Sequence, residues 1–299
     1  MSVPAAFIGV VLIWSTTPLA IQWSSEGWGY LFGVSGRMAL GALVCAVLLL
    51  ILKPGLPWHR EARRTYLAAA VGIYGAMISV YWGAQFIPSG LLAVFYGLNP
   101  LFTGLMAAVW LREQSLTPGK LAGMAAAFAG LVAIFGSDIM LEEGAWWGAM
   151  AVIASVVLHN FSAVWVKRVG AGLPALTVNS GGLFIAVPLF VVTWALADGS
   201  LPVEPSPRAG FALLYLGVFG TALGFSLYYY LLKHVEAGRV ALIPLITPVF
   251  ALMLGQVLNG EQIPHEVYLG SALIILGLAL HVWGDKGLGR LFPVRVERG

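Results

Sequence analysis

The chain has 299 residues, of which 60% are apolar and only 10% are charged, with a formal net charge of +3 and a mean hydropathy of +0.89. Soluble domains contain about 45–50% apolar and about 25% charged residues, so this composition excludes a soluble enzyme or a nucleic-acid-binding protein. The single cysteine, Cys45, excludes an intramolecular disulfide framework and a cysteine-rich metal site. The composition therefore indicates a polytopic membrane protein.

Ten apolar stretches follow one another along the chain, each near the length of about 20 residues that a membrane-spanning helix needs. They cover residues 4–23, 29–52, 66–86, 88–111, 118–136, 145–166, 174–196, 210–232, 237–258 and 267–284. The first stretch lacks a basic n-region and a small-residue cleavage site, so we interpret it as a span and not as a signal peptide. The predicted fold class is all-α, a polytopic membrane protein with ten transmembrane helices.

The basic residues between these spans predict the orientation of the chain. If both termini are cytoplasmic, 14 lysines and arginines lie inside and only Arg208 lies outside, while Arg37 stands within a span. The inside residues are Lys53, Arg60, Arg63, Arg64, Arg112, Lys120, Lys167, Arg168, Lys233, Arg239, Lys286, Arg290, Arg295 and Arg298. Such a bias follows the positive-inside rule. We therefore expect a multi-pass protein of the inner cell membrane with both termini in the cytoplasm.

The two halves of the chain share residues at a constant offset of 148 positions. The shared residues are Tyr81-Trp82 with Tyr229-Tyr230, Asn99-Pro100 with Thr247-Pro248, and Glu113 with Glu261; with a slip of one residue, Gly123 and Gly130 match Gly270 and Gly277. General similarity among apolar helices explains shared leucines, but not a Pro-to-Glu spacing of 13 that occurs twice. Because five spans per half is an odd number, the second half enters the membrane from the opposite side. The pattern predicts two inverted five-helix repeats, residues 1–137 and 138–299, as in secondary transporters.

This doubled pattern of an aromatic pair, a proline, a glutamate and paired glycines resembles the EamA repeat of the drug/metabolite transporter superfamily. The Trp14-Ser15 pair and Arg37 in the second span also resemble that pattern. Within the superfamily the chain is most similar to YddG-type exporters of aromatic and other amino acids. The resemblance implies ten helices, export from the cytoplasm and a central cavity lined by both halves. The sequence departs from the pattern in having Trp-Ser where the family often has Trp-Gly, and in lacking a second-half arginine that matches Arg37.

Arg37 is the one basic residue well inside a span, about eight residues or roughly 12 Å along the helix. An arginine at a helix centre costs about 2.5–3.5 kcal/mol on insertion scales. One interpretation is that its guanidinium binds a substrate carboxylate. The alternative is that the side chain extends to the outer interface or bonds helix-end carbonyls.

Aromatic and polar residues within the spans are the other candidates for substrate binding. The aromatic candidates are Trp14, Tyr74, Tyr81, Tyr96 and Tyr229, and the polar ones are Asn99, His159, Asn160 and Thr247. Aromatic walls suit an apolar or aromatic substrate, whereas tyrosines near a span end also form interfacial belts. A polar pair such as His159 and Asn160 contacts substrate or proton in one interpretation and forms interhelical hydrogen bonds in the other.

Three prolines within the fourth and ninth spans are candidate hinges: Pro100, Pro244 and Pro248. A proline inside a helix removes one backbone hydrogen bond and kinks the helix, so kinks at related positions in two repeats could let the halves move. The alternative is a fixed bend that only serves packing.

The sequence also lacks the motifs of several other classes of membrane protein. It has no Walker A motif, no His-Glu-x-x-His motif and no Gly-x-Ser-x-Gly motif, so we expect neither ATP-driven transport nor an enzyme, and no cofactor or metal. No acidic residue stands well inside a span, which favours a facilitator or coupling through His159. The predicted function is export of amino acids, aromatic and other neutral ones, by alternating access through a central cavity. The rivals are an exporter of another small metabolite or drug, and a channel or membrane-embedded enzyme.

Overall fold

The computed structural model describes residues 2–110, 117–169, 171–200, 206–235 and 243–291. At residues 107, 108, 118, 244, 245 and 281–291 it describes the backbone only. Within these ranges the regular structure is helical and contains no strand. Helices α1 (Val3–Ser25), α2 (Tyr30–Leu52), α8 (Ala145–Val169) and α9 (Ala175–Ala197) run without interruption. So do α7 (Pro118–Phe135), α13 (Ile243–Asn259) and α14 (His265–Leu291), and a short 3₁₀ turn, η2 (Asp138–Leu141), precedes α8.

Three helical rods are irregular. The third predicted span consists of α3 (Arg60–Val71), the π-helical segment η1 (Gly72–Ala76) and α4 (Met77–Gly83). The eighth consists of α10 (Pro207–Tyr215), the π-helical segment η3 (Leu216–Leu223) and α11 (Gly224–His234). The fourth is divided into α5 (Ser89–Tyr96) and α6 (Asn99–Trp110). Single π-helical turns within α-helices often mark functional sites, so these irregular rods draw attention to their neighbours.

Seven of the helical rods are long and apolar enough to cross a membrane: Val3–Ser25, Tyr30–Leu52, Arg60–Gly83, Ser89–Met106, Ala145–Val169, Ala175–Ala197 and Pro207–His234. Shorter apolar helices, of 10–17 residues, occupy three other predicted spans: Gly119–Phe135, Ile246–Asn259 and His265–Leu280. The all-helical, multi-pass class is therefore confirmed, whereas the number ten and the inverted relation of the halves stay predictions.

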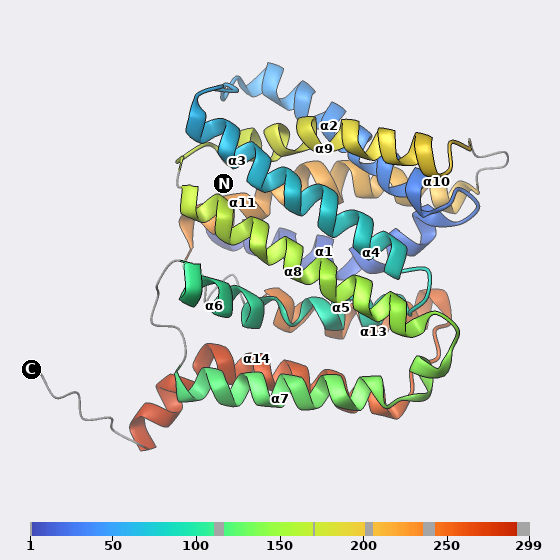
Figure 1. Ribbon diagram of the computed structural model, residues 1–299, viewed down its shortest axis with the longest axis vertical. Coiled ribbons are helices and arrows are strands. Elements are labelled where there is room, and N and C mark those ends of the chain that lie inside the picture. Colours follow the sequence, from blue (N-terminus) through green and yellow to red (C-terminus); the bar gives the residue numbers. More distant parts are fainter. Residues whose placement is uncertain (1, 111–116, 170, 201–205, 236–242, 292–299) are drawn as a thin grey trace, which may run out of the picture.

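The helices lie side by side in a bundle, and their order across it is visible in Figure 1. Helices α7 and α14 pair at one end of the long axis, and α2 and α9 lie together at the other. Between them, α1 contacts α13, α11 and α5, while α8 contacts α3, α4 and α6. The start of α1 and the end of α14 point toward the same edge of the bundle in Figure 1. The central helices α1, α5, α8 and α13 therefore surround the middle of the molecule.

Glycines let α7 and α14 approach at backbone distance. A Cβ atom on Gly130 would lie 2.5 Å from the carbonyl oxygen of Gly270, and one on Gly270 would lie 2.6 Å from that of Gly130. One on Gly277 would lie 2.5 Å from the Gly123 oxygen and 2.7 Å from the backbone nitrogen of Ala127. Small residues are the usual means of close helix packing in membranes, so these glycines hold the pair together.

We expect Gly277→Ala to destabilise the protein by roughly 1–3 kcal/mol, because its methyl group would force the two backbones apart. The measurement is the midpoint of thermal unfolding in detergent. Gly210→Ala in α10 is the matched control, since a Cβ atom there meets nothing closer than 3.9 Å. The control should keep or raise the midpoint, as alanine favours helix over glycine. Equal midpoints for the two variants would contradict the close packing of α7 on α14.

Candidate substrate cavity

A cavity lies in the middle of the bundle. The space in this cavity that the centre of a water molecule can occupy is about 70 Å³. One water molecule needs roughly 10–15 Å³ of such space. The cavity wall is formed by Trp14, Thr17, Pro18, Ile21, Arg37, Met77, Val80, Leu92, Ala93, Tyr96, Asn99, His159, Phe225 and Thr247. Six of the ten predicted substrate-binding residues are in this wall: Trp14, Arg37, Tyr96, Asn99, His159 and Thr247. Among the described residues no group of three histidines, cysteines or carboxylates could hold a metal ion.

Arg37 brings a cation into the apolar interior. Its side chain is 2% exposed, its Nε donates to Thr221 Oγ1 at 2.9 Å, and its Cζ lies 5.9 Å from the centre of the Tyr81 ring. Its Nη1 is buried and has no hydrogen-bond partner in the described part of the chain. The ion pairs found there are His59–Glu61 and Arg208–Glu26 and do not include Arg37. The alternative of a side chain that extends to the interface is therefore wrong, and a guanidinium with unused donor capacity borders the cavity.

His159 is surrounded by aromatic rings. Its ring centre lies 6.0 Å from that of Trp14, 6.1 Å from that of Tyr96 and 5.3 Å from that of Tyr228. Its Nε2 is buried without a hydrogen-bond partner among the described residues. Trp14 and Tyr228 contact each other at 5.0 Å, which closes the cluster. The cavity therefore has one aromatic wall, formed by Trp14, Tyr96 and His159, in which His159 Nε2 has no partner.

Asn160 forms hydrogen bonds between α8 and α6. Its Nδ2 donates to Asn99 Oδ1 at 2.7 Å and to Val156 O at 2.7 Å, and its Oδ1 accepts from Thr103. This is the interhelical hydrogen bonding that formed the alternative to substrate contact, and Asn160 is absent from the cavity wall. Because the Asn99 oxygen is engaged by Asn160, the NH₂ group of Asn99 remains to serve the cavity.

Tyr96 is fixed by a hydrogen-bonded chain that leads to the first π-helical segment. Its hydroxyl and Ser155 Oγ are 2.6 Å apart, and Ser155 Oγ also donates to Ala76 O at 2.6 Å. Since Ala76 is the last residue of η1, a side chain of α8 supplies a donor to a carbonyl of that irregular turn. The ring of Tyr96 is therefore held against the cavity by α8 and η1 together.

Three predicted tyrosines are outside the cavity wall. The Tyr74 hydroxyl forms a 2.7 Å hydrogen bond with Thr193 Oγ1, so this side chain points toward α9. Tyr81 is fully buried with its hydroxyl 3.3 Å from Ser24 Oγ, and Tyr229 is buried against Phe225 and Tyr228. In this structure these three tyrosines lie outside the cavity wall, so they are not placed for direct contact with a substrate.

The prolines differ from one another in position. Pro100 is the second residue of α6 and follows the break at Gly97-Leu98, so it begins a helix instead of kinking one. Pro248 stands inside α13, next to Thr247 of the cavity wall. Pro244 is in the first turn of α13, and its side chain lies outside the described residues. Their role as hinges stays a prediction, and an interior kink at Pro100 or Pro244 is corrected to a helix start.

Sequence reasoning did not select Thr221 and Asn179, which hold Arg37 in place. Thr221 belongs to η3, and Asn179 Nδ2 donates to Thr221 O at 3.1 Å, Ala222 O at 3.3 Å and Ser226 Oγ at 3.1 Å. A π-helical turn shifts carbonyls out of the regular pattern, and Asn179 of α9 provides a donor for two of them. The signal in the sequence was an asparagine within an otherwise apolar span.

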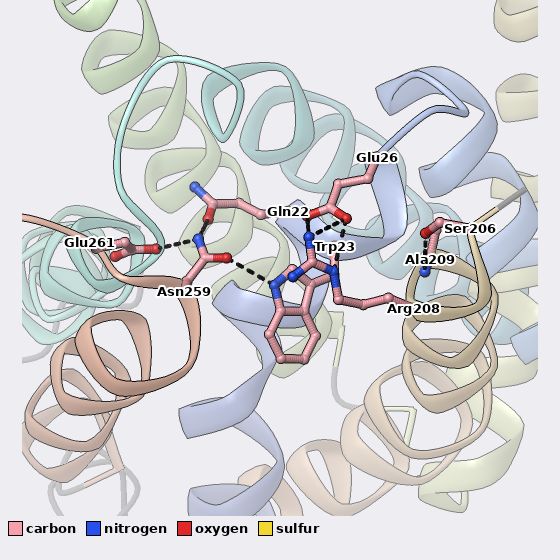
Figure 2. Close-up of polar contacts among 8 residues, drawn as sticks. All are labelled: Gln22, Trp23, Glu26, Ser206, Arg208, Ala209, Asn259 and Glu261. Atoms are coloured by element: carbon pink, nitrogen blue, oxygen red, sulfur yellow. Dashed lines mark hydrogen bonds and ion pairs between the residues drawn. The ribbon is translucent and has the colours of Figure 1, made fainter.

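A group of polar side chains, here called the polar latch, joins the ends of three helices, and Figure 2 shows all of its members except Ser89. Asn259 accepts from Trp23 Nε1 at 3.0 Å and donates to Gln22 at 3.3 Å and to Glu261 at 3.1 Å. Glu261 in turn accepts from the backbone nitrogen and hydroxyl of Ser89 at 3.0 and 2.6 Å. The polar latch therefore consists of Gln22, Trp23, Asn259, Glu261 and Ser89.

The polar latch adjoins the cavity on two of its helices. On α1 Gln22 directly follows Ile21 of the cavity wall, and on α5 Ser89 precedes Leu92 by three residues, about one helical turn. The Glu261 carboxylate caps the start of α5, where the helix dipole favours a negative charge. Beside it, Arg208 forms a two-pronged ion pair with Glu26 at 2.7–2.9 Å (Figure 2). These contacts join α1, α5, α10 and α13 near their ends.

The model of the EamA-like transporter family matches the chain twice, over residues 2–136 and 146–283. An uncharacterized transporter, YoaV, of Bacillus subtilis is 23% identical over 95% of this chain and 97% of its own length. The uncharacterized inner membrane transporter YedA of Escherichia coli is 27% identical over 97% and 92%. A probable terminal-alkyne amino-acid exporter of Streptantibioticus cattleyicolor is 27% identical over 92% and 91%.

A solved crystal structure superposes with a TM-score of 0.71 at 20% identity, covering 96% of this chain and 98% of the other, which supports the fold alone. The family consists of transporters and not of enzymes, and the apolar helices place the chain in a membrane. The resemblance found in the sequence is thereby confirmed at the level of the family and not of one exporter type. The protein is a multi-pass membrane transporter of small molecules, and it belongs to the EamA-like transporter family.

Proposed function

We propose that the protein exports small carboxylate-bearing metabolites with apolar or aromatic bodies, amino acids among them, by alternating access. The observation that carries this proposal is the Arg37 guanidinium, which borders the cavity with an unpaired buried Nη1. A buried charge without a partner is costly, and a substrate carboxylate would supply that partner. The aromatic wall of Trp14, Tyr96 and His159 provides apolar surface for the rest of the substrate.

Two relatives bear on the substrate class through their names. One is the amino-acid exporter of Streptantibioticus, and another is an S-adenosylmethionine/S-adenosylhomocysteine transporter of Chlamydia trachomatis, 25% identical over 90% of this chain and 85% of its own length. Neither name singles out aromatic amino acids. The YddG-type preference therefore rests on the aromatic wall of the cavity.

Three observations support an inverted repeat as the basis of alternating access. The family model matches each half of the chain separately. The first π-helical segment, moved by the offset of 148 residues, falls on residues 220–224 and overlaps η3. The glycine contacts between α7 and α14 pair Gly130 with Gly270 and Gly123 with Gly277, in opposite order along the two helices. The predicted repeats, 1–137 and 138–299, would then exchange roles when the cavity opens to the other side.

Replacing Arg37 should weaken substrate binding without unfolding the protein. For Arg37→Met we expect the half-saturating concentration in phenylalanine or tryptophan counterflow to rise roughly tenfold to a hundredfold, because a charged hydrogen bond is worth about 1.5–3 kcal/mol. The thermal midpoint should stay equal or increase, since an apolar side chain replaces a buried unpaired charge. The measurement is saturable counterflow in liposomes that contain the purified protein.

Arg63→Gln is the control, since Arg63 is exposed on α3 and far from the cavity wall. It should change neither quantity. A lowered midpoint with unchanged affinity for Arg37→Met would assign Arg37 a structural role and overturn the proposal.

The polar latch would be the outer gate of such a transporter. In the predicted orientation α1 and α13 end outside, so Trp23, Asn259 and Glu261 would stand at the outer ends of two helices that line the cavity. Release of substrate to the outside then requires these hydrogen bonds to break. The structure, with the polar latch formed, would correspond to a state closed to the outside.

Loss of the polar latch should open the cavity outward more often. In a Cys45→Ala background with Ala93→Cys in the cavity wall, we expect Asn259→Ala to raise the rate of labelling by a membrane-impermeant thiol reagent, added outside intact cells, roughly fivefold to tenfold. This corresponds to the loss of hydrogen bonds worth about 1 kcal/mol in total. Gln85→Ala is the control, because Gln85 is exposed and bonds only Trp82 O in its own turn. A rate that Asn259→Ala leaves unchanged, or lowers, would refute the gate.

A further inference from the structure

The cavity wall contains a positively charged side chain and no negatively charged one. Of the fourteen residues that form it, Arg37 alone carries a permanent charge, and neither an aspartate nor a glutamate is present. Two carboxylates near the ends of α13 and α1, Glu261 and Glu26, are bonded to the start of α5 and to Arg208. An anionic group in the cavity therefore has a cationic partner, and a cationic group has no ionised partner.

The hydrogen-bonding groups of the wall show the same bias. Arg37 Nη1 is a donor without a partner, and the NH₂ of Asn99 is available because Asn160 already engages its oxygen. Among the hydroxyls, Thr17 Oγ1 donates to Ile13 O and the Tyr96 hydroxyl is bonded to Ser155. The donors left over in the wall, one of them charged, suit the acceptor oxygens of a carboxylate, whereas the acceptor capacity left on the Thr17 and Tyr96 hydroxyls is uncharged.

An α-amino acid places its ammonium group on the carbon next to the carboxylate. If the carboxylate binds Arg37, the ammonium comes close to the same guanidinium, and two like charges repel each other strongly in a poorly screened interior. The ammonium must also give up its hydration, which costs free energy unless hydrogen bonds replace it. The aromatic faces at His159 offer a cation–π contact, which is weaker than the cost of leaving a buried cation unpaired.

We propose that the cavity recognises the carboxylate and not the amino group, so that its preferred ligands are small monoanionic carboxylic acids with an apolar or aromatic body. This inference rests on the contact between Arg37 and a carboxylate in the proposed function and narrows its substrate class. Zwitterionic amino acids with the same body are then weaker ligands, and amines without a carboxylate are not ligands.

Three compounds that share a phenylethyl body test this inference: 3-phenylpropionate, phenylalanine and phenethylamine. The measurement is the dissociation constant by calorimetric titration of the purified full-length protein at pH 7.5, where the carboxylates and amines are ionised. We expect 3-phenylpropionate to bind at least about tenfold more tightly than phenylalanine, a difference of about 1.4 kcal/mol. Phenethylamine should show no binding.

The Arg37 variants separate this inference from the proposed function. Arg37→Met should remove the binding of 3-phenylpropionate, and Arg37→Lys, which keeps the charge, should restore part of it. Phenylalanine binding more tightly than 3-phenylpropionate, or phenethylamine binding as well as either, would overturn the inference while leaving carboxylate export by Arg37 in place. Equal binding of 3-phenylpropionate to wild type and to folded Arg37→Met would overturn the proposed function and, with it, this inference.

Discussion

Within a membrane, every polar group in the interior must find its partner inside the protein, because lipid offers none. The bundle meets this constraint almost throughout: hydroxyls such as Ser162 Oγ bond backbone carbonyls of neighbouring helices, here Ala68 O at 2.7 Å. In the described part of the chain only five buried side-chain atoms lack a partner, and two of them, Arg37 Nη1 and His159 Nε2, border the cavity. Part of the unused hydrogen-bonding capacity therefore belongs to two residues that line the cavity, and the rest belongs to Trp28, Asn179 and Trp194.

The π-helical segments extend the same constraint to the backbone. At η3, Asn179 donates to the carbonyls of Thr221 and Ala222, and the Thr221 hydroxyl accepts from Arg37. At η1, Ser155 donates to Ala76 O and bonds Tyr96. In both cases a neighbouring helix satisfies carbonyls of an irregular turn, and the same group of contacts fixes a side chain of the cavity wall. The irregular turns thus position Arg37 and Tyr96, and a change in either turn would displace a side chain of the cavity wall.

The positions of the helices could be predicted from the sequence, but the faces that they present could not. Long apolar runs locate spans well; the run 29–52 corresponds to α2, Tyr30–Leu52. Orientation about the helix axis needs a contrast between an apolar and a polar face, and that contrast is absent where lipid and protein interior are equally apolar. Tyr96 and Tyr81 were therefore equivalent candidates, although only Tyr96 reaches the cavity. Residues whose polarity is exceptional, Arg37 and His159, could be chosen because burial makes them costly anywhere else.

The proline at position 100 and the glutamate at position 261 show a different limit. A single sequence shows that Pro100 departs from regular helix, but whether it kinks a helix or begins one depends on the turn at Gly97-Leu98 before it. The recurrence of Glu261 at the repeat offset was visible, yet its partner, the start of α5, lies 172 positions away. Contacts at such a distance are set by the arrangement of the helices, which the local pattern does not contain.

The unpaired state of Arg37 argues that stability has been given up for binding. A residue needed only for packing between α2 and η3 could be apolar, at no desolvation cost, whereas an arginine at helix depth costs about 2.5–3.5 kcal/mol. The cavity is large enough to hold several water molecules beside the Arg37 side chain, although its Nη1 atom is itself buried. Under the proposed function, a carboxylate that enters the cavity would displace water from it and form a charge-assisted contact with Arg37. Binding of an anion would then be coupled to drying of the cavity, and drying would favour closure of the helices around the substrate.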